Sequence, residues 1–391
     1  MEDPVSRKSI GIIGAILLAT ALPAALAQSP AAAGTPKTAA EAFKNIQILK
    51  DAPADQIFPA MQFITASLGV NCEFCHVRNA FEKDDKEEKR TARKMMTMMF
   101  AINKDNFGDE REVTCYTCHA GAAHPTSVPV ISEPPKPEPP PGMNGPGGSG
   151  AGSAAAAAPG ADAILDKYVQ EIGGEDALHK ITTRVEKGTL SGMGPGGMPV
   201  EVFAKAPDAR VTVVHGPRGE NVTAYNGQTG WMSGFGPPRP ITGGELDNEK
   251  RNADFYFASD IKQAFQQISN ARLVSVSDLA GLPAFSQGEA YLLVARSPGK
   301  PPVRFYFDKD SGLLLREVRY VETPLGRNPS QVDYADYRDV DGVKIPFKWT
   351  IARPGGRFTI QIDQVQQNVP IDESKFAEPS APSPGAKPPS P

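Results

Sequence analysis

Apolar and polar residues alternate with a period of two along much of the second half of the chain. Between residues 343 and 351 every second side chain is apolar and falls on one face of an extended segment: Val343, Ile345, Phe347, Trp349 and Ile351. Residues 358–362 repeat the alternation, and turn-forming pairs such as Asn226-Gly227 and Asp341-Gly342 separate the runs. This pattern predicts an antiparallel sheet with one face towards a core and the other towards water.

A helical period replaces the alternation at two places in the same region. Four apolar residues fall on one helix face before Gly173-Gly174 end the segment: Ile164, Leu165, Tyr168 and Ile172. A second helical stretch is expected near residues 245–265, where it would cover the sheet. Residues 161–378 are therefore predicted to form an α+β domain with an antiparallel sheet and covering helices.

Residues 38–127 are rich in Met, Lys and Glu and predict an all-α domain. Four apolar residues at helical spacing predict one helix face: Phe58, Met61, Ile64 and Leu68. A further helix is expected to begin with the mixed charge run EKDDKEEKRTARK, residues 82–94, in which Glu82 and Lys86, like Asp85 and Lys89, are four residues apart. Such pairs stabilise an exposed helix face, so we expect these side chains in solvent.

Two segments have a composition that cannot bury a core. Residues 128–160 are rich in Pro and then in Gly and Ala, which predicts a linker, and residues 379–391 predict a disordered tail. Because such a linker offers no means of packing its neighbours together, the domains at residues 38–127 and 161–378 are expected to be separable.

The N-terminus predicts export from the cytoplasm. Arg7 and Lys8 precede an apolar run, residues 10–26, which ends in the small-residue pattern Ala25-Leu26-Ala27. These features are typical of a signal peptide, here residues 1–27, and predict a periplasmic protein. The alternative is an uncleaved segment that keeps the protein at the membrane, for which the apolar run is short. The formal net charge of -4 argues against a nucleic-acid partner.

All four cysteines of the chain lie in two Cys-x-x-Cys-His units. The units are Cys72, Cys75 and His76, then Cys115, Cys118 and His119. Two disulfides, a zinc site and a thiol–disulfide exchange site are alternatives at this spacing. A zinc site does not need a His at the same offset in both units, and an exchange site does not need two copies. Covalent haem attachment uses both thiols and the adjacent iron-ligating His, so the sequence predicts two covalently attached haem c groups.

Methionines precede both units and are candidates for the second axial ligand of the haem iron. Met61 is the only methionine between residue 27 and Cys72, and KMMTMMFAIN before the second unit contains Met95, Met96, Met98 and Met99. Thioether sulfur favours reduced iron and suits an electron carrier, whereas a peroxidase-type enzyme keeps this position open. Packing in a helix interface is the alternative role for each methionine.

Three motifs occur together in residues 40–127: a Met-bearing segment before Cys-x-x-Cys-His, the stretch ARKMMTMMFAIN, and CYTCHAG. In this combination the region resembles the cytochrome c subunit of the photosynthetic reaction centre. That family is a periplasmic multihaem electron carrier, mostly with Met–His ligated haems. The resemblance implies Met61 as ligand of the first haem and Met98, which leads into Ile102-Asn103, as ligand of the second, with Met95 as runner-up. The best-known form of the family carries four haems, whereas this chain has two motifs.

The strand pattern of residues 161–378, with phrases such as YRDVDGVKIPFKWTI, is similar to the periplasmic lipoprotein-carrier fold. The resemblance implies a curved antiparallel half-barrel wrapped around helices, with a cavity for a hydrophobic ligand. A scaffold or docking domain is the alternative.

We interpret the whole chain as a periplasmic dihaem c-type cytochrome, an electron carrier rather than an enzyme. Expected partners are periplasmic redox proteins, among them a membrane-bound reaction centre or respiratory complex. The alternatives are a peroxidase-type haem enzyme and a haem-linked module whose C-terminal domain holds a hydrophobic ligand. His124 is within reach of an iron in principle but is expected to face solvent, and His179 and His215 receive no role.

Overall fold

The computed structural model describes residues 37–125, 158–194, 196–217, 219–234, 238–276, 288–354 and 356–378. These residues belong to one compact unit, Lys37–Pro391. The predicted signal peptide (1–27), nearly all of the predicted linker (128–160) and the predicted tail (379–391) lie outside the described residues. Within the described ranges, no helix combines the length and apolar character needed to cross a bilayer.

The N-terminal region is helical, as predicted, and is built from short helices around one long helix. The elements are α1 (Ala39–Ala42), η1 (Ala54–Gln56), α2 (Ile57–Leu68), α3 (Cys72–Cys75), α4 (Glu87–Phe107) and α5 (Cys115–His119). Its core packs one face of α2 against two methionines of α4: Ile57, Ala60, Phe63, Ile64, Met96 and Met99. Phe58 does not share the core-facing side of α2 with Ile64, although their spacing predicts one helix face. Phe58 is 58% exposed, and α2 turns the neighbouring Ile57 towards the core instead.

The long helix α4 begins later than the charge run predicts, at Glu87. Residues 82–86 lie outside the helix, so Asp85 and Lys89 do not face each other along one helical turn. Lys89 is only 8% exposed, and its ammonium group turns inward to carbonyl oxygens of the preceding loop and to Asp84. The predicted solvated face is therefore wrong for Lys89, because this loop supplies the acceptors that water would otherwise provide.

The C-terminal region forms one antiparallel sheet whose described strands follow the order β6-β5-β4-β3-β2-β1-β14-β13-β12-β11-β10-β9-β7, with β8 beside β9. The strands are β1 (Thr183–Ser191), β2 (Met198–Lys205), β3 (Ala209–Gly216), β4 (Gly219–Asn226), β5 (Gly230–Ser233), β6 (Arg239–Ile241), β7 (Gln267–Ile268), β8 (Arg272–Ser275), β9 (Glu289–Arg296), β10 (Val303–Asp308), β11 (Leu314–Thr323), β12 (Gly326–Val340), β13 (Val343–Arg353) and β14 (Gly356–Gln367). Of the alternation predicted for residues 343–351, β13 buries Val343, Ile345, Phe347 and Trp349, whereas Ile351 is only half-buried. The first strand in the chain, β1, pairs with the last one, β14.

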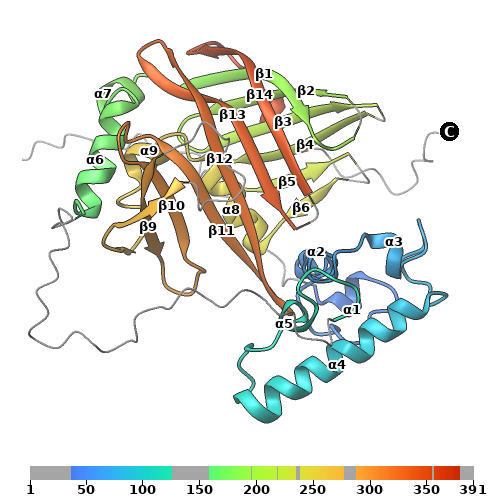
Figure 1. Cartoon of the computed structure of the whole chain (residues 1–391). Helices are drawn as coiled ribbons and strands as arrows, with labels where there is room; N and C mark the ends of the chain where they lie inside the picture. The colour runs from blue at the N-terminus through green and yellow to red at the C-terminus, as the bar shows by residue number, and fades with distance from the viewer. Residues whose placement is uncertain are drawn as a thin grey trace, which may run out of the picture. The chain divides into compact units, whose positions relative to one another are not determined.

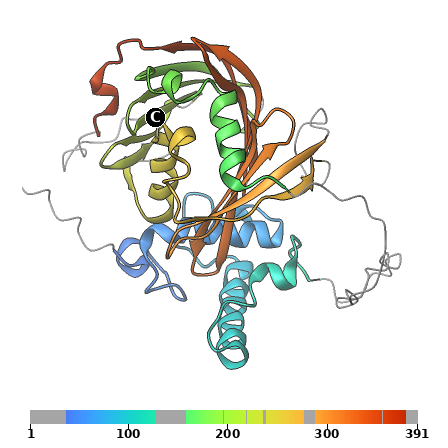
Figure 2. The same ribbon diagram turned by 90° about the vertical axis from the view of Figure 1, so that its left-hand side faces the viewer.

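The sheet curves strongly, and α6 (Ala161–Glu171), α8 (Gly243–Ala253) and α9 (Phe257–Asp260) lie on its concave side (Figures 1 and 2). The predicted face of α6 is confirmed, since Ile164, Leu165 and Tyr168 are buried in one cluster with Phe305 and Phe307 of β10. The short helices α7 (Glu175–Leu178) and η3 (Glu373–Phe376) complete the region. It is the predicted α+β arrangement of a curved antiparallel sheet with covering helices.

Buried charged groups lie between the sheet and α8. Glu317 is 1% exposed and binds Arg319 through two contacts of 2.6 Å. Arg319 also donates to Oδ1 of Asn252 in α8 at 2.7 Å. Burial raises the pKa of the adjacent Tyr334 above its usual range, with the Glu317 carboxylate adding to the effect. The concave side of the sheet therefore holds a buried ion pair in addition to its apolar cluster.

The tip of the β11–β12 hairpin completes the core of the N-terminal region. Leu325 is fully buried and belongs to the same apolar cluster as the residues of α2 and α4. Nearby, Asn328 donates to the carbonyl oxygen of Pro59 at 2.6 Å, and Arg111 pairs with Glu322 at 2.9 Å. The linker composition does not indicate this contact, because it comes from a hairpin far from the linker in sequence, and the separability of the two domains stays a prediction.

Truncating Leu325 is expected to destabilise the chain. Because its side chain has no exposed surface, Leu325→Ala should lower the free energy of unfolding by about 2–5 kcal/mol. Leu273→Ala is the matched control, since Leu273 is 40% exposed and its truncation should change stability by less than about 0.5 kcal/mol. Urea unfolding followed by circular dichroism measures both variants, and equal losses would contradict the observed packing of the hairpin tip.

Candidate haem-attachment site

The first Cys-x-x-Cys-His unit forms a single helical turn, α3. Asn71 caps this turn, its Oδ1 accepting a hydrogen bond from the Phe74 amide at 3.2 Å. Residues three apart on a helix lie on the same side, so the thiols of Cys72 and Cys75 share one face of the turn. His76 follows at the C-cap in an extended conformation, which directs the chain away from the turn.

The second unit repeats this design in α5. Thr117 Oγ1 accepts a hydrogen bond from the Thr114 amide at 3.0 Å and closes the start of the helix. Cys115 and Cys118 again lie three apart on one turn, and His119 is the last residue of the helix. Both units thus place their two cysteines on one helical turn, but His76 lies beyond its turn in an extended conformation whereas His119 is still helical.

The C-terminal end of α2 is held against the loop that follows the second unit. The Gly121 amide donates to the carbonyl oxygen of Ser67 at 2.9 Å. A Cβ atom on Gly69 would lie 2.1 Å from the Gly121 carbonyl oxygen, and Gly69 also has a φ of 65°, so both space and backbone conformation require glycine there. This contact fixes the helix that carries Met61 relative to the second unit.

Asn103 anchors α4 to the segment that leads into the second unit. It is 2% exposed, its Nδ2 donates to the Val113 carbonyl oxygen at 2.7 Å, and its Oδ1 accepts from the Val113 amide at 2.9 Å. The sequence indicates Ile102-Asn103 only as the end of a motif. The structure shows that Asn103 positions the methionine-bearing helix beside Cys115.

Both unit histidines donate a hydrogen bond from Nδ1 to a backbone carbonyl oxygen. His76 Nδ1 lies 3.0 Å from the Phe81 oxygen, and His119 Nδ1 lies 3.0 Å from the Ala122 oxygen. A carbonyl oxygen only accepts, so Nδ1 carries the proton and Nε2 keeps its lone pair. No hydrogen bond from the described part of the chain reaches either Nε2. Burial also lowers the pKa of His76, which favours the neutral ring that a metal requires.

The four thiols are free, and their surroundings argue against the alternatives to haem. Burial raises the pKa of Cys75 and of Cys115, whereas a thiol–disulfide exchange site needs a lowered thiol pKa. Among the described residues, no three His, Cys, Asp or Glu side chains are grouped so that they could hold a metal ion. The four thiols therefore do not converge as a structural zinc site would require.

The methionines of α4 divide into a buried pair and an exposed pair. Met96 and Met99 are 7% and 5% exposed and fill the core, as expected for packing residues. Met95 and Met98 are 39% and 47% exposed and share another face of the helix. Met61 is half-buried at the edge of the same core. Met95 and Met98, the ligand candidates on α4, are thus the two methionines of this pair of faces that the core does not bury, whereas Met61 packs against the core.

Most of the exposed large apolar side chains among the described residues lie in the N-terminal region. Of the large apolar side chains that are exposed in the described residues, all but Met193 and Leu273 fall between residues 43 and 116: Phe43, Phe58, Phe81, Met95, Met98, Phe107 and Tyr116. Exposed large apolar side chains are candidates for contact with a bound group. Porphyrin rings tethered at the Cys units would take up such a surface, so the residues present fit the predicted haem groups.

The remaining histidines have ordinary surroundings. His124 is exposed, as expected. His179 lies 3.3 Å from the Ser259 hydroxyl, and His215 pairs with Glu201 at 3.3 Å, both within the sheet region. None of these contacts adds a residue to the candidate site.

Replacing Asn103 is expected to loosen the second unit. Asn103→Ala removes two hydrogen bonds and leaves the Val113 amide and carbonyl without their partner, which should lower the free energy of unfolding by about 1–3 kcal/mol. The control is Asn106→Ala on the same helix, because exposed Asn106 bonds only the Ile102 carbonyl one turn back. Urea unfolding measures both. Losses of equal size would contradict a special role for Asn103.

Residues 14–177 match the family model of the photosynthetic reaction centre cytochrome C subunit, so the resemblance of the N-terminal region is confirmed. The reaction centre cytochrome c subunit of Thermochromatium tepidum is 35% identical over 111 residues, 27% of this chain and 28% of the relative. Cytochrome c-554 of Chloroflexus aurantiacus is 34% identical over 85 residues, 20% of each protein. The matched part is thus between a fifth and a third of the length of these relatives.

Solved structures similar to this chain include two bacterial proteins. A LolA superfamily protein from Nitrosomonas europaea is 14% identical and covers 56% of this chain and 98% of its own, with a TM-score of 0.34. An outer membrane lipoprotein-sorting domain from Vibrio parahaemolyticus is 9% identical and covers 55% and 94%, with a TM-score of 0.36.

Proposed function

We propose, from the similarity of residues 14–177 to the reaction centre cytochrome c subunits, that the chain is a dihaem c-type cytochrome that carries electrons outside the cytoplasm. Cys72 and Cys75 would tether the first haem, and Cys115 and Cys118 the second. The observation that carries the proposal is the matched geometry of the two units. Each unit combines two free thiols on one helical turn with a histidine whose Nδ1 is bonded to a backbone carbonyl group.

The axial ligands would be one histidine and one methionine for each iron. His76 and Met61 are proposed for the first haem, and His119 and Met98 for the second, with Met95 as runner-up to Met98. When bound, the haem iron takes up and releases one electron. Two protein ligands leave no open coordination position, which favours electron transfer over peroxide chemistry.

The protein's own contribution is to hold these ligands in place before an electron arrives. The Asn103 bonds to Val113 fix α4, and the contact of Gly121 with Ser67 fixes α2. A preorganised site needs little rearrangement when the charge at its centre changes. Rigid ligand positions therefore suit rapid electron transfer.

Redox proteins outside the cytoplasm are the proposed partners. A membrane-bound reaction centre is one candidate, because the Thermochromatium tepidum relative is named as a subunit of that complex. A respiratory complex is the other. We propose two haems rather than the four of the family's best-known form, because the chain has two Cys-x-x-Cys-His units.

The sheet region is proposed to act as a scaffold for the haem region. Buried Leu325 and the bond from Asn328 to Pro59 support this role, and the buried Glu317–Arg319 pair makes part of the concave side unsuited to a lipid. Organic extraction of the purified chain tests the other role, in which this region holds a hydrophobic molecule. Recovery of a stoichiometric lipid or quinone would favour that role.

An optical spectrum combined with a redox titration tests the proposed function. We expect low-spin iron, a methionine-sulfur charge-transfer band and two one-electron transitions. High-spin iron that reacts with hydrogen peroxide would overturn the carrier proposal and indicate a peroxidase-type enzyme.

A further inference from the structure

We propose that Lys89 raises the midpoint potential of the haem tethered at Cys72 and Cys75, acting as a positioning residue through the carbonyl group of Phe81. The inference rests on the proposed function, because it needs a haem whose iron is bound by His76. It goes beyond that function, because neither the spacing of the Cys units nor the family resemblance assigns a role to Lys89.

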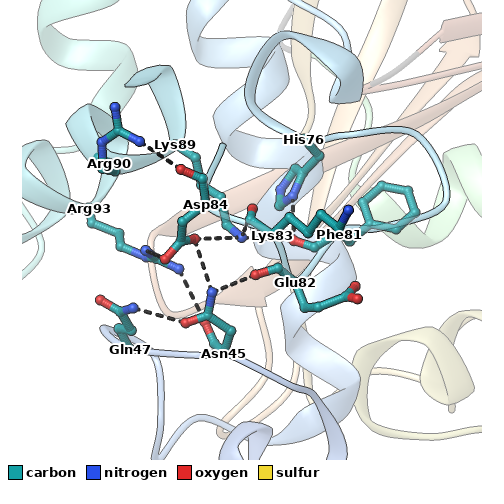
Figure 3. Close-up of polar contacts among 10 residues, drawn as sticks. All are labelled: Asn45, Gln47, His76, Phe81, Glu82, Lys83, Asp84, Lys89, Arg90 and Arg93. Atoms are coloured by element: carbon teal, nitrogen blue, oxygen red, sulfur yellow. Dashed lines mark hydrogen bonds and ion pairs between the residues drawn. The ribbon is translucent and has the colours of Figure 1, made fainter. Parts of the chain in front are cut away.

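The Phe81 carbonyl oxygen accepts hydrogen bonds from two donors of different kinds. His76 Nδ1 lies 3.0 Å from it, and Lys89 Nζ lies 2.8 Å from it (Figure 3). Lys89 Nζ also donates to the Lys83 carbonyl oxygen at 2.7 Å and pairs with Asp84 at 3.0 Å. Lys89 comes from α4 and is 8% exposed, so a buried cation stands one carbonyl group away from the proposed iron ligand.

The carboxylate of Asp84 does not cancel this positive charge, because it is shared. Arg93 binds the other oxygen of Asp84 at 2.8 Å, and Asn45 Nδ2 donates to Oδ1 at 3.0 Å (Figure 3). Arg93, Asn45 and Lys89, in that order of effect, hold the pKa of Asp84 well below its usual range. Two cations and one carboxylate leave a net positive charge beside the loop that carries Phe81.

Two physical effects of this arrangement have the same sign. An ammonium group draws electron density from the carbonyl oxygen, which then accepts less strongly from His76, and a weaker bond at Nδ1 makes the imidazole a poorer donor to iron. The buried positive charge also destabilises oxidised iron more than reduced iron, because oxidised iron carries one more positive charge. Both effects favour the reduced haem and raise its potential.

A purely structural role is the competing explanation, since Lys89 also ties down the loop of residues 81–84. The two roles predict different effects when the positive charge of Lys89 is removed and a hydrogen-bond donor is kept. A structural tie needs only a donor at this position, whereas the electronic role needs a cation. Lys89→Arg keeps both, Lys89→Gln keeps a donor without the charge, and Lys89→Met removes both.

Spectroelectrochemical titration of the full haem-loaded chain tests the proposal. We expect Lys89→Gln and Lys89→Met to lower the potential of the first haem and leave the second unchanged, with Lys89→Arg close to the wild type. Lys94→Met is the matched control, because Lys94 is an exposed cation on the same helix and its loss should move neither potential appreciably. A Cys115→Ala, Cys118→Ala chain lacks the second haem, so the redox transition that remains in its titration belongs to the first haem.

The outcomes separate this proposal from the proposed function. An unchanged first potential in Lys89→Gln, with both haems attached, overturns the role of Lys89 and leaves the cytochrome function standing. The proposal is also overturned if Lys89→Gln shifts the potentials of both haems equally, or if Lys94→Met shifts the first potential as much as Lys89→Gln does. A wild-type chain without haem at Cys72 and Cys75 overturns the proposed function itself.

Discussion

A chain in which Cys72 and Cys75 are both replaced by alanine should be isolated with one covalent haem instead of two. The two thiols share one face of the α3 turn and are free, and α5 presents Cys115 and Cys118 independently. Removing one pair therefore removes one tether and leaves the other intact. The pyridine haemochrome assay, normalised to polypeptide, measures the number of haems per chain.

The reciprocal double variant, Cys115→Ala with Cys118→Ala, is the control for this experiment. It should also retain one haem, but with the potential of the first site. Retention of both haems by either variant would show that the cysteines are not the tethers. Loss of both from either one would show that the two sites fold as a unit.

The replacement of Met98 is expected to have the second largest effect. Met98 is 47% exposed and contributes little to the apolar core, so the main effect expected of Met98→Ala is the loss of one iron ligand rather than a cavity in the core. The opened haem should become high-spin, bind carbon monoxide and titrate at a lower potential. Met61→Ala should do the same at the first haem.

Met96→Ala is the matched control on the same helix. Met96 is 7% exposed, so its truncation should lower the free energy of unfolding by about 2–5 kcal/mol and leave the spectrum unaltered. If Met95→Ala opens an iron and Met98→Ala does not, the ligand is the runner-up. If neither variant changes the spectrum, another group holds that iron.

The local parts of the fold follow from the sequence because their causes are local. The alternation of residues 343–349 predicts β13, and the face of Ile164, Leu165 and Tyr168 predicts α6. The two cysteines of each Cys-x-x-Cys-His unit lie on one helical turn, which is a local structure of a few residues. The division of the α4 methionines into core and exposed pairs likewise follows from helical spacing once one face is buried.

The parts that sequence reasoning missed depend on contacts between distant residues. The burial of Lys89 requires the carbonyl groups of a loop whose path no periodicity indicates. Leu325 enters the N-terminal core from a hairpin tip more than two hundred positions later in the chain, and a single leucine in a turn carries no signal of that contact. The role of Asn103 likewise depends on the return of the chain at Val113.

The number of haem groups carried by the intact chain tests the central claim most directly. The full sequence, produced in a host that attaches haem c outside the cytoplasm, is purified without chelators and its mass is determined under denaturing conditions. The account predicts a mass that exceeds the polypeptide by two haem groups, lost one at a time when either Cys pair is replaced. A mass equal to that of the polypeptide alone would contradict it.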